Sequence, residues 1–127
     1  MLTLICGFPR AGKTTYSQQY EGKCPVLHFD EIHSYSYILK QVQNTTDDIV
    51  IEGIYIHPRF REQLVKAYHG QGTQCIYLNT SIEIRKTREG YTPTAYHRFD
   101  EPTYFEGWDD IIIITDNTDI KHLEKDL

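Results

Sequence analysis

Hydrophobic residues along the chain form five short runs, and the segments between them carry apolar residues at helical spacing. The runs occupy residues 2–6, 26–29, 49–51, 75–78 and 111–114. Apolar residues recur at intervals of three or four from Ile32 to Val42, and at intervals of four through Phe60, Leu64 and Tyr68. Such intervals place side chains on one face of a helix. Continuous apolar strands that alternate with helices are typical of a parallel sheet covered on both faces. The sequence therefore predicts an α/β fold with about five parallel strands.

Turn and capping residues indicate where the shorter helices begin and end. Pro58 suits the first turn of the helix before the fourth run. Ser81 can cap a short helix that Gly90 ends. Thr118 or Asp119 can cap a brief helix at the end of the chain. These signals predict helices on both sides of the last apolar run.

The size of the chain limits it to one domain. It has 127 residues and a mass of 14.9 kDa, too little for two separate cores. No apolar run approaches the roughly 18 residues that span a bilayer, and the first residues carry no secretion signal. We expect one soluble, cytoplasmic domain over residues 1–127 with no membrane partner. Cys6, Cys24 and Cys75 form no C-x-x-C pair and are expected to be reduced, structural thiols.

Charge is unevenly distributed along the sequence. The formal net charge is −5. Residues 55–98 carry seven Lys or Arg against three Glu, whereas residues 100–127 carry two Lys against nine acidic residues. This distribution excludes a general basic nucleic-acid surface and leaves room for a local basic patch. An anionic ligand is expected to bind the middle of the chain or the phosphate loop described next.

A complete phosphate-loop motif follows the first apolar run. It reads Gly7-Phe8-Pro9-Arg10-Ala11-Gly12-Lys13-Thr14 and matches G-x-x-x-x-G-K-[ST] between a predicted strand and a predicted helix. Gly7 and Gly12 let backbone N–H groups approach phosphate oxygens. Lys13 supplies charge to the β- and γ-phosphates, Thr14 offers a hydroxyl to Mg²⁺, and Thr15 follows in the helix. The motif predicts a site for ATP and Mg²⁺, with GTP as an alternative nucleotide; the other interpretation is a tight turn with an incidental lysine.

Carboxylates follow the second and third predicted strands. In an open parallel sheet the ligand lies beyond the carboxyl ends of the strands, so Asp30, Glu31 and Glu52 are expected to face the crevice of the phosphate loop. Asp30 is the candidate general base for a phosphoryl acceptor, and its alternative role is a helix N-cap. Glu52 is expected to hold Mg²⁺ through water or to position the acceptor; its alternative is a pair with a nearby arginine.

Three arginines are candidates for charge stabilisation during transfer. Arg85 and Arg88 share a face of the short predicted helix, and Arg98 follows on an irregular segment. Guanidinium groups that close over a triphosphate stabilise the transferring phosphoryl group. The region at about 81–108 is therefore a candidate lid. The alternative is that these arginines form surface ion pairs with Glu83 or Glu89.

A second motif gives the sequence a family resemblance. The stretch Arg98-Phe99-Asp100-Glu101-Pro102-Thr103-Tyr104-Phe105-Glu106-Gly107-Trp108-Asp109 runs into the last apolar run. Together with the phosphate loop, it resembles P-loop kinases of the polynucleotide kinase type, including the stand-alone kinases of phage and bacterial genomes. The resemblance implies an ATP- and Mg²⁺-dependent kinase of a 5′-hydroxyl. It also implies that Asp30 is the general base and that Arg85 or Arg88 is the lid arginine.

The sequence departs from that family on the acceptor side. Glu52-Gly53-Ile54-Tyr55 stands where such kinases often have Asp-x-Thr-Asn, and His33 stands where an acceptor-contacting arginine is expected. Our leading hypothesis is a kinase of a nucleic-acid 5′-end or a nucleotide-like acceptor. The alternatives are a small-molecule kinase of the gluconate or antibiotic type, and an ATP-binding switch that acts through a partner.

Overall fold

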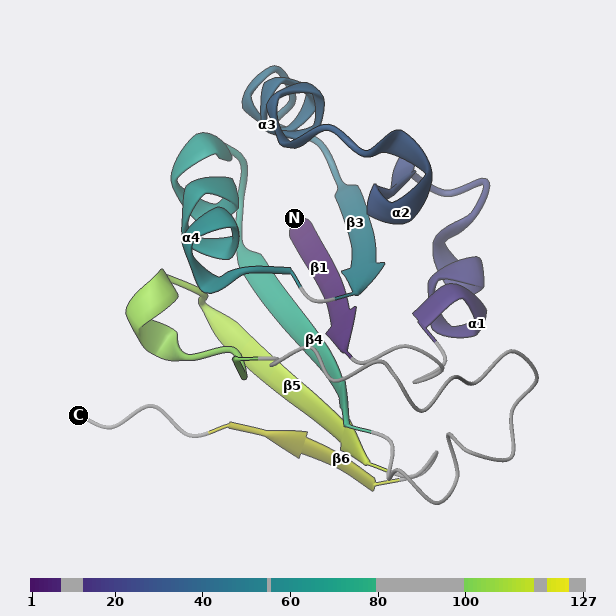
Figure 1. The fold of residues 1–127 in the computed structure, drawn as a ribbon, viewed down its shortest axis with the longest axis vertical. Coiled ribbons are helices and arrows are strands. Elements are labelled where there is room, and N and C mark those ends of the chain that lie inside the picture. Colours follow the sequence, from purple (N-terminus) through teal and green to yellow (C-terminus); the bar gives the residue numbers. More distant parts are fainter. Residues whose placement is uncertain (8–12, 55, 80–99, 116–118, 124–127) are drawn as a thin grey trace.

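The computed structural model describes residues 1–7, 13–54, 56–79, 100–115 and 119–123. They form six strands, four α-helices and two short 3₁₀ helices (Figure 1). In chain order these are β1 (Leu2–Gly7), α1 (Lys13–Ser17), η1 (Gln18–Tyr20), β2 (Val26–His28), α2 (Phe29–Ile32), α3 (Tyr35–Gln43), β3 (Ile49–Ile54), α4 (Pro58–Ala67), β4 (Thr73–Asn79), η2 (Tyr104–Glu106), β5 (Asp110–Thr115) and β6 (Asp119–His122).

The strands form one mixed sheet in the order β2-β3-β1-β4-β5-β6. The first five strands pair in parallel, which confirms the predicted parallel sheet. β1 lies in the middle, with Leu2 in register with Ile49 of β3 and with Thr73 of β4. The chain therefore adds strands first on one side of β1 and then on the other. In open parallel sheets, ligands bind beyond the carboxyl ends of the strands at such a switch point.

Two layers of apolar side chains cover the two faces of the sheet. Alternate residues of a strand point to opposite faces. On one face, Leu4 and Ile51 belong to a buried cluster with residues of α3 and α4, which pack side by side. On the other face, Ile5 and Val50 belong to a cluster with Tyr16 of α1. Helices therefore lie on both faces, as predicted.

The helical pattern that begins at Ile32 is interrupted by a break. α2 ends at Ile32 and is followed by His33, whose φ of 54° and ψ of 28° are left-handed. Ser34 then caps α3, and its side chain accepts a hydrogen bond of 3.2 Å from the backbone N–H of Tyr37. The prediction of one continuous helix was wrong because apolar spacing continues across the break, whereas the cap residues end one helix and begin the next.

The end of the chain forms a strand, so the predicted terminal helix is wrong. β6 pairs antiparallel with β5, and Ile120 lies in register with Ile114. The backbone N–H of Leu123 adds a hydrogen bond of 2.8 Å to the carbonyl of Ile111. β5 would otherwise present an unpaired edge, and satisfying that edge outweighs the weak helical signal of a short polar segment.

The three cysteines are free thiols, as predicted. Cys6 and Cys75 are fully buried on neighbouring strands, with their Sγ atoms 3.7 Å apart. Burial and the neighbouring thiol of Cys6 raise the pKa of Cys75 well above its ordinary value. The thiol of Cys75 therefore stays protonated, and both buried cysteines pack as small apolar side chains.

Candidate functional site

The carboxyl ends of the parallel strands meet at one edge of the sheet. In Figure 1 the arrowheads of β1, β3, β4 and β5 point to this lower edge. Gly7 is the last residue of β1, and Lys13 is the first residue of α1. Phe8, Pro9, Arg10, Ala11 and Gly12 lie outside the described residues. The predicted phosphate loop therefore joins the central strand to the helix on one face of the sheet.

The residues that flank the loop differ in exposure. The side chain of Lys13 is buried, with 5% of its surface exposed, whereas Thr15 is exposed. Thr14 lies between them in α1. Buried lysines are rare unless their charge is paired, and Lys13 does interact with another group in the structure. This position at the start of the helix is the one that the motif requires of its lysine.

Asp30 lies at the same edge but not directly after a strand. β2 ends at His28, and Phe29 begins α2, so Asp30 and Glu31 belong to the first turn of a four-residue helix. Both are exposed. The N-cap position of α2 belongs to His28, so the alternative role of Asp30 as N-cap is wrong.

Glu52 is buried inside β3, two residues before the strand ends, rather than at its end as predicted. His28 of β2 is its partner in the parallel register. The Nδ1 atom of His28 lies 2.8 Å from Oε2 of Glu52, and its Nε2 atom lies 3.3 Å from Oε1 of Glu21. Glu52 is therefore paired with a histidine and not with the arginine of the alternative interpretation.

This pair affects the charge of the imidazole. Burial lowers the pKa of His28, but hydrogen bonds to Glu52 and Glu21 and the nearby charge of Glu31 raise it more, so the net shift is upward. A protonated imidazole donates from both nitrogens and would hold a carboxylate on each side. Hydrogen bonds thus link the exposed Glu21, the half-buried His28 and the buried Glu52 in a chain.

The second oxygen of the buried Glu52 carboxylate fits magnesium chemistry. Mg²⁺ is usually held by one or two carboxylates together with phosphates and waters. Within the described residues, Oε2 of Glu52 bonds to His28 while Oε1 makes no hydrogen bond. The described part of the chain contains no group of three or more His, Cys, Asp or Glu side chains that could hold a metal ion. Glu52 therefore offers one hard oxygen donor, which suits a metal that also binds a nucleotide.

An aromatic cluster that the sequence pattern does not reveal includes Phe29, the residue before Asp30. The ring of Tyr35 lies 4.7 Å from that of Phe29 and 4.2 Å from that of Phe60, measured between centroids. Tyr35 keeps 45% of its surface exposed. Gly53 is close beneath the cluster, since a Cβ atom there would stand 2.9 Å from Cβ of Phe29. The three rings come from α2, α3 and α4, and only their three-dimensional packing brings them together.

The candidate lid divides into two parts. Arg85, Arg88 and Arg98 lie outside the described residues, so their role stays a prediction. Residues 100–108 are described and pack against α4. Glu106 and Trp108 are buried in this segment, at 6% and 1% exposure. The described end of the region is therefore part of the core.

A buried ion pair holds this segment in place. Arg61 of α4 is fully buried, and its Nε atom donates a hydrogen bond of 2.8 Å to Oε1 of Glu106. Its other nitrogens donate to Oε2 of Glu106 and to the carbonyls of Ile56 and Asp100. Burial lowers the pKa of Arg61, but the Glu106 carboxylate more than offsets this and raises it. Arg61 is the residue that sequence reasoning missed, because its partner is 45 positions away.

Glu106 also explains the motif that carries the family resemblance. Its side chain accepts from the backbone N–H of Thr103, and the two residues form a capping box around η2. Oε1 of Glu106 also accepts a hydrogen bond of 3.0 Å from Nε1 of Trp108. Gly107 ends the turn at φ 102°, a conformation that favours glycine. Within this motif, Thr103, Glu106, Gly107 and Trp108 therefore stabilise the fold.

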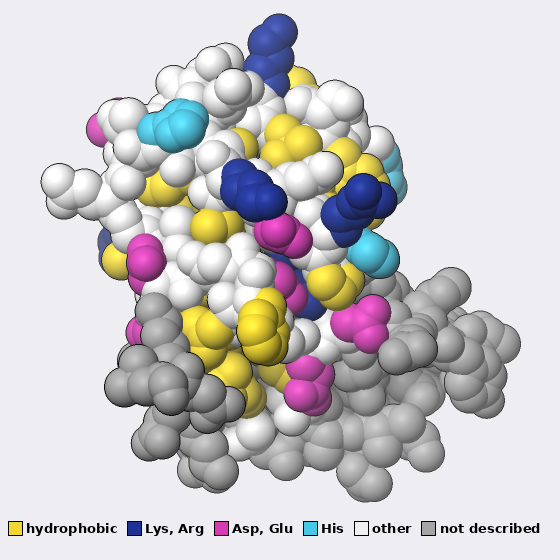
Figure 2. Space-filling model, turned by 90° about the vertical axis from the view of Figure 1, so that its left-hand side faces the viewer, with side chains coloured by type: hydrophobic (Ala, Val, Ile, Leu, Met, Phe, Trp, Pro, Cys, Tyr) yellow, Lys and Arg dark blue, Asp and Glu magenta, His cyan; other side chains and the backbone are white. Residues whose placement is uncertain are grey.

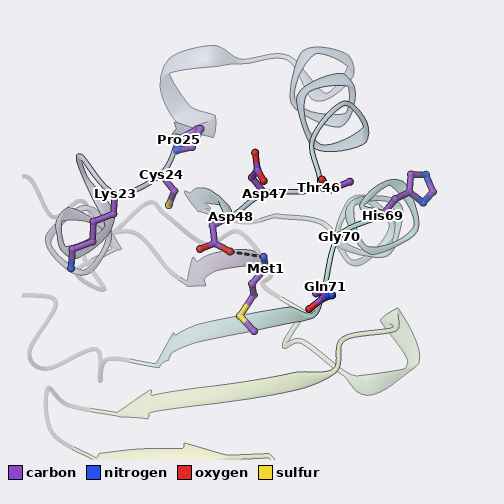
Figure 3. A pocket seen from close by; sticks show the side chains of 10 residues that line it. All are labelled: Met1, Lys23, Cys24, Pro25, Thr46, Asp47, Asp48, His69, Gly70 and Gln71. Carbon is purple, nitrogen blue, oxygen red and sulfur yellow. Dashed lines mark hydrogen bonds and ion pairs between the residues drawn. The ribbon is translucent and has the colours of Figure 1, made fainter.

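A polar groove of about 890 Å³ lies at the opposite edge of the sheet (Figure 3). It is formed by segments that precede β1, β2, β3 and β4, so it is distant from the carboxyl edge. The Met1 ammonium contacts Asp48 at 2.6 Å inside it, while Lys23 and His69 point outward at its two ends. None of the predicted nucleotide or acceptor residues lines this groove.

On the side of the molecule next to α4, acidic and basic side chains of the described residues are interspersed (Figure 2).

No helix in the described part of the chain is long and apolar enough to cross a bilayer. Phe105, on η2, is 98% exposed.

Comparison with known proteins shows a likeness in fold. No protein-family model matches the sequence, and no curated protein is significantly similar to it. Among solved structures, an unliganded sugar kinase from Janibacter sp. HTCC2649 superposes with a TM-score of 0.63. The match has 15% sequence identity and covers 90% of this chain and 84% of the other. The chain therefore has the α/β fold of a known kinase.

Proposed function

We propose that this chain is an ATP- and Mg²⁺-dependent kinase that transfers the γ-phosphoryl group to a hydroxyl group. The observation that carries the proposal is the sequence from Gly7 to Thr14, set between the carboxyl end of the central strand and the start of α1. The likeness to a sugar kinase supports a kinase-type fold over most of the chain. The kinase domain spans residues 1–127 in this proposal.

In this proposal the nucleotide is held by the phosphate loop. Backbone N–H groups from Gly7 to Thr15 and the Lys13 ammonium bind the β- and γ-phosphates. Thr14 and Glu52 bind Mg²⁺, directly or through water, and the ion neutralises charge on the phosphates. The side chains of Arg85, Arg88 and Arg98 stabilise the phosphoryl group during transfer.

Asp30 is the proposed general base. It accepts the proton of the acceptor hydroxyl while the acceptor oxygen forms a bond to the γ-phosphorus and the bond to the β-phosphate oxygen breaks. The products are a phosphate ester and ADP. Support comes from its place beyond β2, at the same edge as Gly7, and from its exposure.

The acceptor that we favour is a nucleic-acid 5′-hydroxyl or a nucleotide-like molecule. The family resemblance of the Pro102–Trp108 segment supports it, and so does the exposed ring of Tyr35, which packs against Phe29, the residue before Asp30. Aromatic rings stack on bases without a strong sequence preference. The second candidate is a small sugar, which the likeness to a sugar kinase favours.

A panel of acceptors tests this proposal. Purified protein is incubated with Mg²⁺, ATP labelled on the γ-phosphate, and 5′-hydroxyl DNA, 5′-hydroxyl RNA, nucleosides, nucleotides or sugars. Label on an oligonucleotide end supports the favoured acceptor, and label on a sugar replaces it with the second candidate. Release of phosphate to water alone, with ATP bound, would replace the kinase with a nucleotide-dependent switch.

A further inference from the structure

The buried carboxylate of Glu52 lies on the same face of the sheet as α1, the helix that follows the phosphate loop. Residues alternate between faces along β3, so Glu52 shares the face of Val50. Val50 packs in the apolar cluster that includes Tyr16 of α1. α1 also contacts β3 and begins at Lys13, directly after the phosphate loop. Among the described residues, Glu52 is thus the buried acidic side chain on the face of the sheet where the proposed nucleotide binds.

The conformation of this carboxylate depends on His28. The Glu52 side chain is 4% exposed, that of His28 is 22% exposed and that of Glu21 is 54% exposed. Because His28 and Glu52 are in-register neighbours on paired strands, the imidazole meets Oε2 at 2.8 Å without a long side-chain reach. The hydrogen bond between Glu21 and the second nitrogen fixes the ring in turn. With Oε2 held, the direction of Oε1 is also determined.

We propose that His28 is a positioning residue that orients Oε1 of Glu52 toward the Mg²⁺ of the bound nucleotide. This inference rests on the proposed function, because it requires a nucleotide with its metal at the carboxyl edge. Groups that hydrogen-bond to a metal-binding side chain fix its orientation, and their loss weakens metal affinity by about 10- to 100-fold. His28 touches neither the nucleotide nor the reacting atoms in this arrangement.

Two substitutions of His28 separate positioning from general structure. The side-chain nitrogen of asparagine occupies nearly the position of Nδ1, so His28→Asn keeps a donor for Glu52. The side-chain nitrogen of glutamine reaches nearly the position of Nε2, so His28→Gln keeps the contact with Glu21 and loses the one with Glu52. Both replacement side chains are polar and uncharged. They differ in which carboxylate they can hold.

The readout is equilibrium binding of a fluorescent, non-hydrolysable ATP analogue, titrated with Mg²⁺ and repeated in EDTA. For His28→Gln, we expect the half-saturating Mg²⁺ concentration to rise about 10- to 100-fold. His28→Asn should stay close to the wild type. Affinity for the analogue in EDTA should be the same in all three proteins. Thermal unfolding of each variant verifies that it is folded.

Two results would overturn the proposal. One is a half-saturating Mg²⁺ concentration in His28→Gln equal to that of the wild type. The other is an equal loss of analogue affinity with and without Mg²⁺, which indicates a distorted nucleotide site. Either result leaves the proposed kinase intact if the wild type binds the analogue with Mg²⁺. A wild type that does not bind the analogue at all would overturn the proposed function itself.

Discussion

Replacing Glu106 by glutamine tests whether the buried ion pair holds the Pro-Thr-x-x-Glu-Gly-Trp segment in place. The side chain keeps its shape but loses its charge, and one oxygen becomes an amide nitrogen. That nitrogen faces the donors of Arg61 and Trp108 if it replaces Oε1, or those of Arg61 and Thr103 if it replaces Oε2. Arg61 is fully buried, so its charge would lose the carboxylate of Glu106 where water cannot replace it. Breaking a buried pair in this way costs about 3–5 kcal/mol, a large share of the 5–15 kcal/mol that typically stabilises a domain.

Urea and thermal unfolding measure this loss. For a chain of this size we expect the Tm of Glu106→Gln to fall on the order of 10–20 °C. Glu62→Gln is the matched control, because Glu62 follows Arg61 on α4 and forms an exposed ion pair with Lys66 at 2.8 Å. Its Tm should hardly change. Equal unfolding midpoints for the two variants would refute the structural role of the pair. Arg61→Met combined with Glu106→Gln should recover part of the loss, because the buried charge that lost its carboxylate is removed.

Two further substitutions test the packing around the two edges of the sheet. In Gly53→Ala, the new Cβ atom would lie 2.8 Å from Cδ1 of Ile56 and 2.9 Å from Cβ of Phe29, so a loss of about 1–3 kcal/mol is expected in urea unfolding; an unchanged midpoint would contradict this packing. In Tyr68→Phe, the lost hydroxyl hydrogen bonds, of 2.9 and 3.1 Å, to two carbonyls before β3 should cost about 1 kcal/mol. Burial and nearby aspartates raise the pKa of Tyr68 above 10.0, so the unfolded chain loses this proton first as pH rises. Wild-type stability should therefore fall from about pH 10 through the raised pKa, and this component should be missing in Tyr68→Phe.

The sequence predicts the parallel sheet because its strands are buried on both faces. The runs at 2–6, 49–51 and 75–78 have no polar alternation, and this is the pattern of a covered parallel strand. β6 was missed because Asp119–His122 is short and gains its stability from pairing with β5. The spacing of apolar residues along a short segment does not show whether a neighbouring strand will pair with it. The helix predicted at this position was therefore wrong.

The sequence predicts which residues lie in the candidate site better than it predicts which of them contact one another. Strand order places Gly7, Asp30 and Lys13 at one edge, as general rules for open sheets predict. The partner of Glu52 was missed because the register of β2 against β3 decides which residue faces it, and the register is not visible in spacing. The Arg61–Glu106 pair also needed the folded chain, since 45 residues separate its members.

Measuring ATP binding and phosphoryl transfer in the same preparations tests the central claim most directly. The proteins are the wild type, Asp30→Asn and the control Glu31→Gln, which alters the neighbouring exposed carboxylate of α2. The account predicts equal ATP affinity in all three, transfer reduced by about 10²- to 10⁴-fold in Asp30→Asn, and near-normal transfer in Glu31→Gln. Undiminished transfer in Asp30→Asn would remove Asp30 as the base, and the absence of transfer from ATP to every hydroxyl acceptor by the wild type would contradict the kinase.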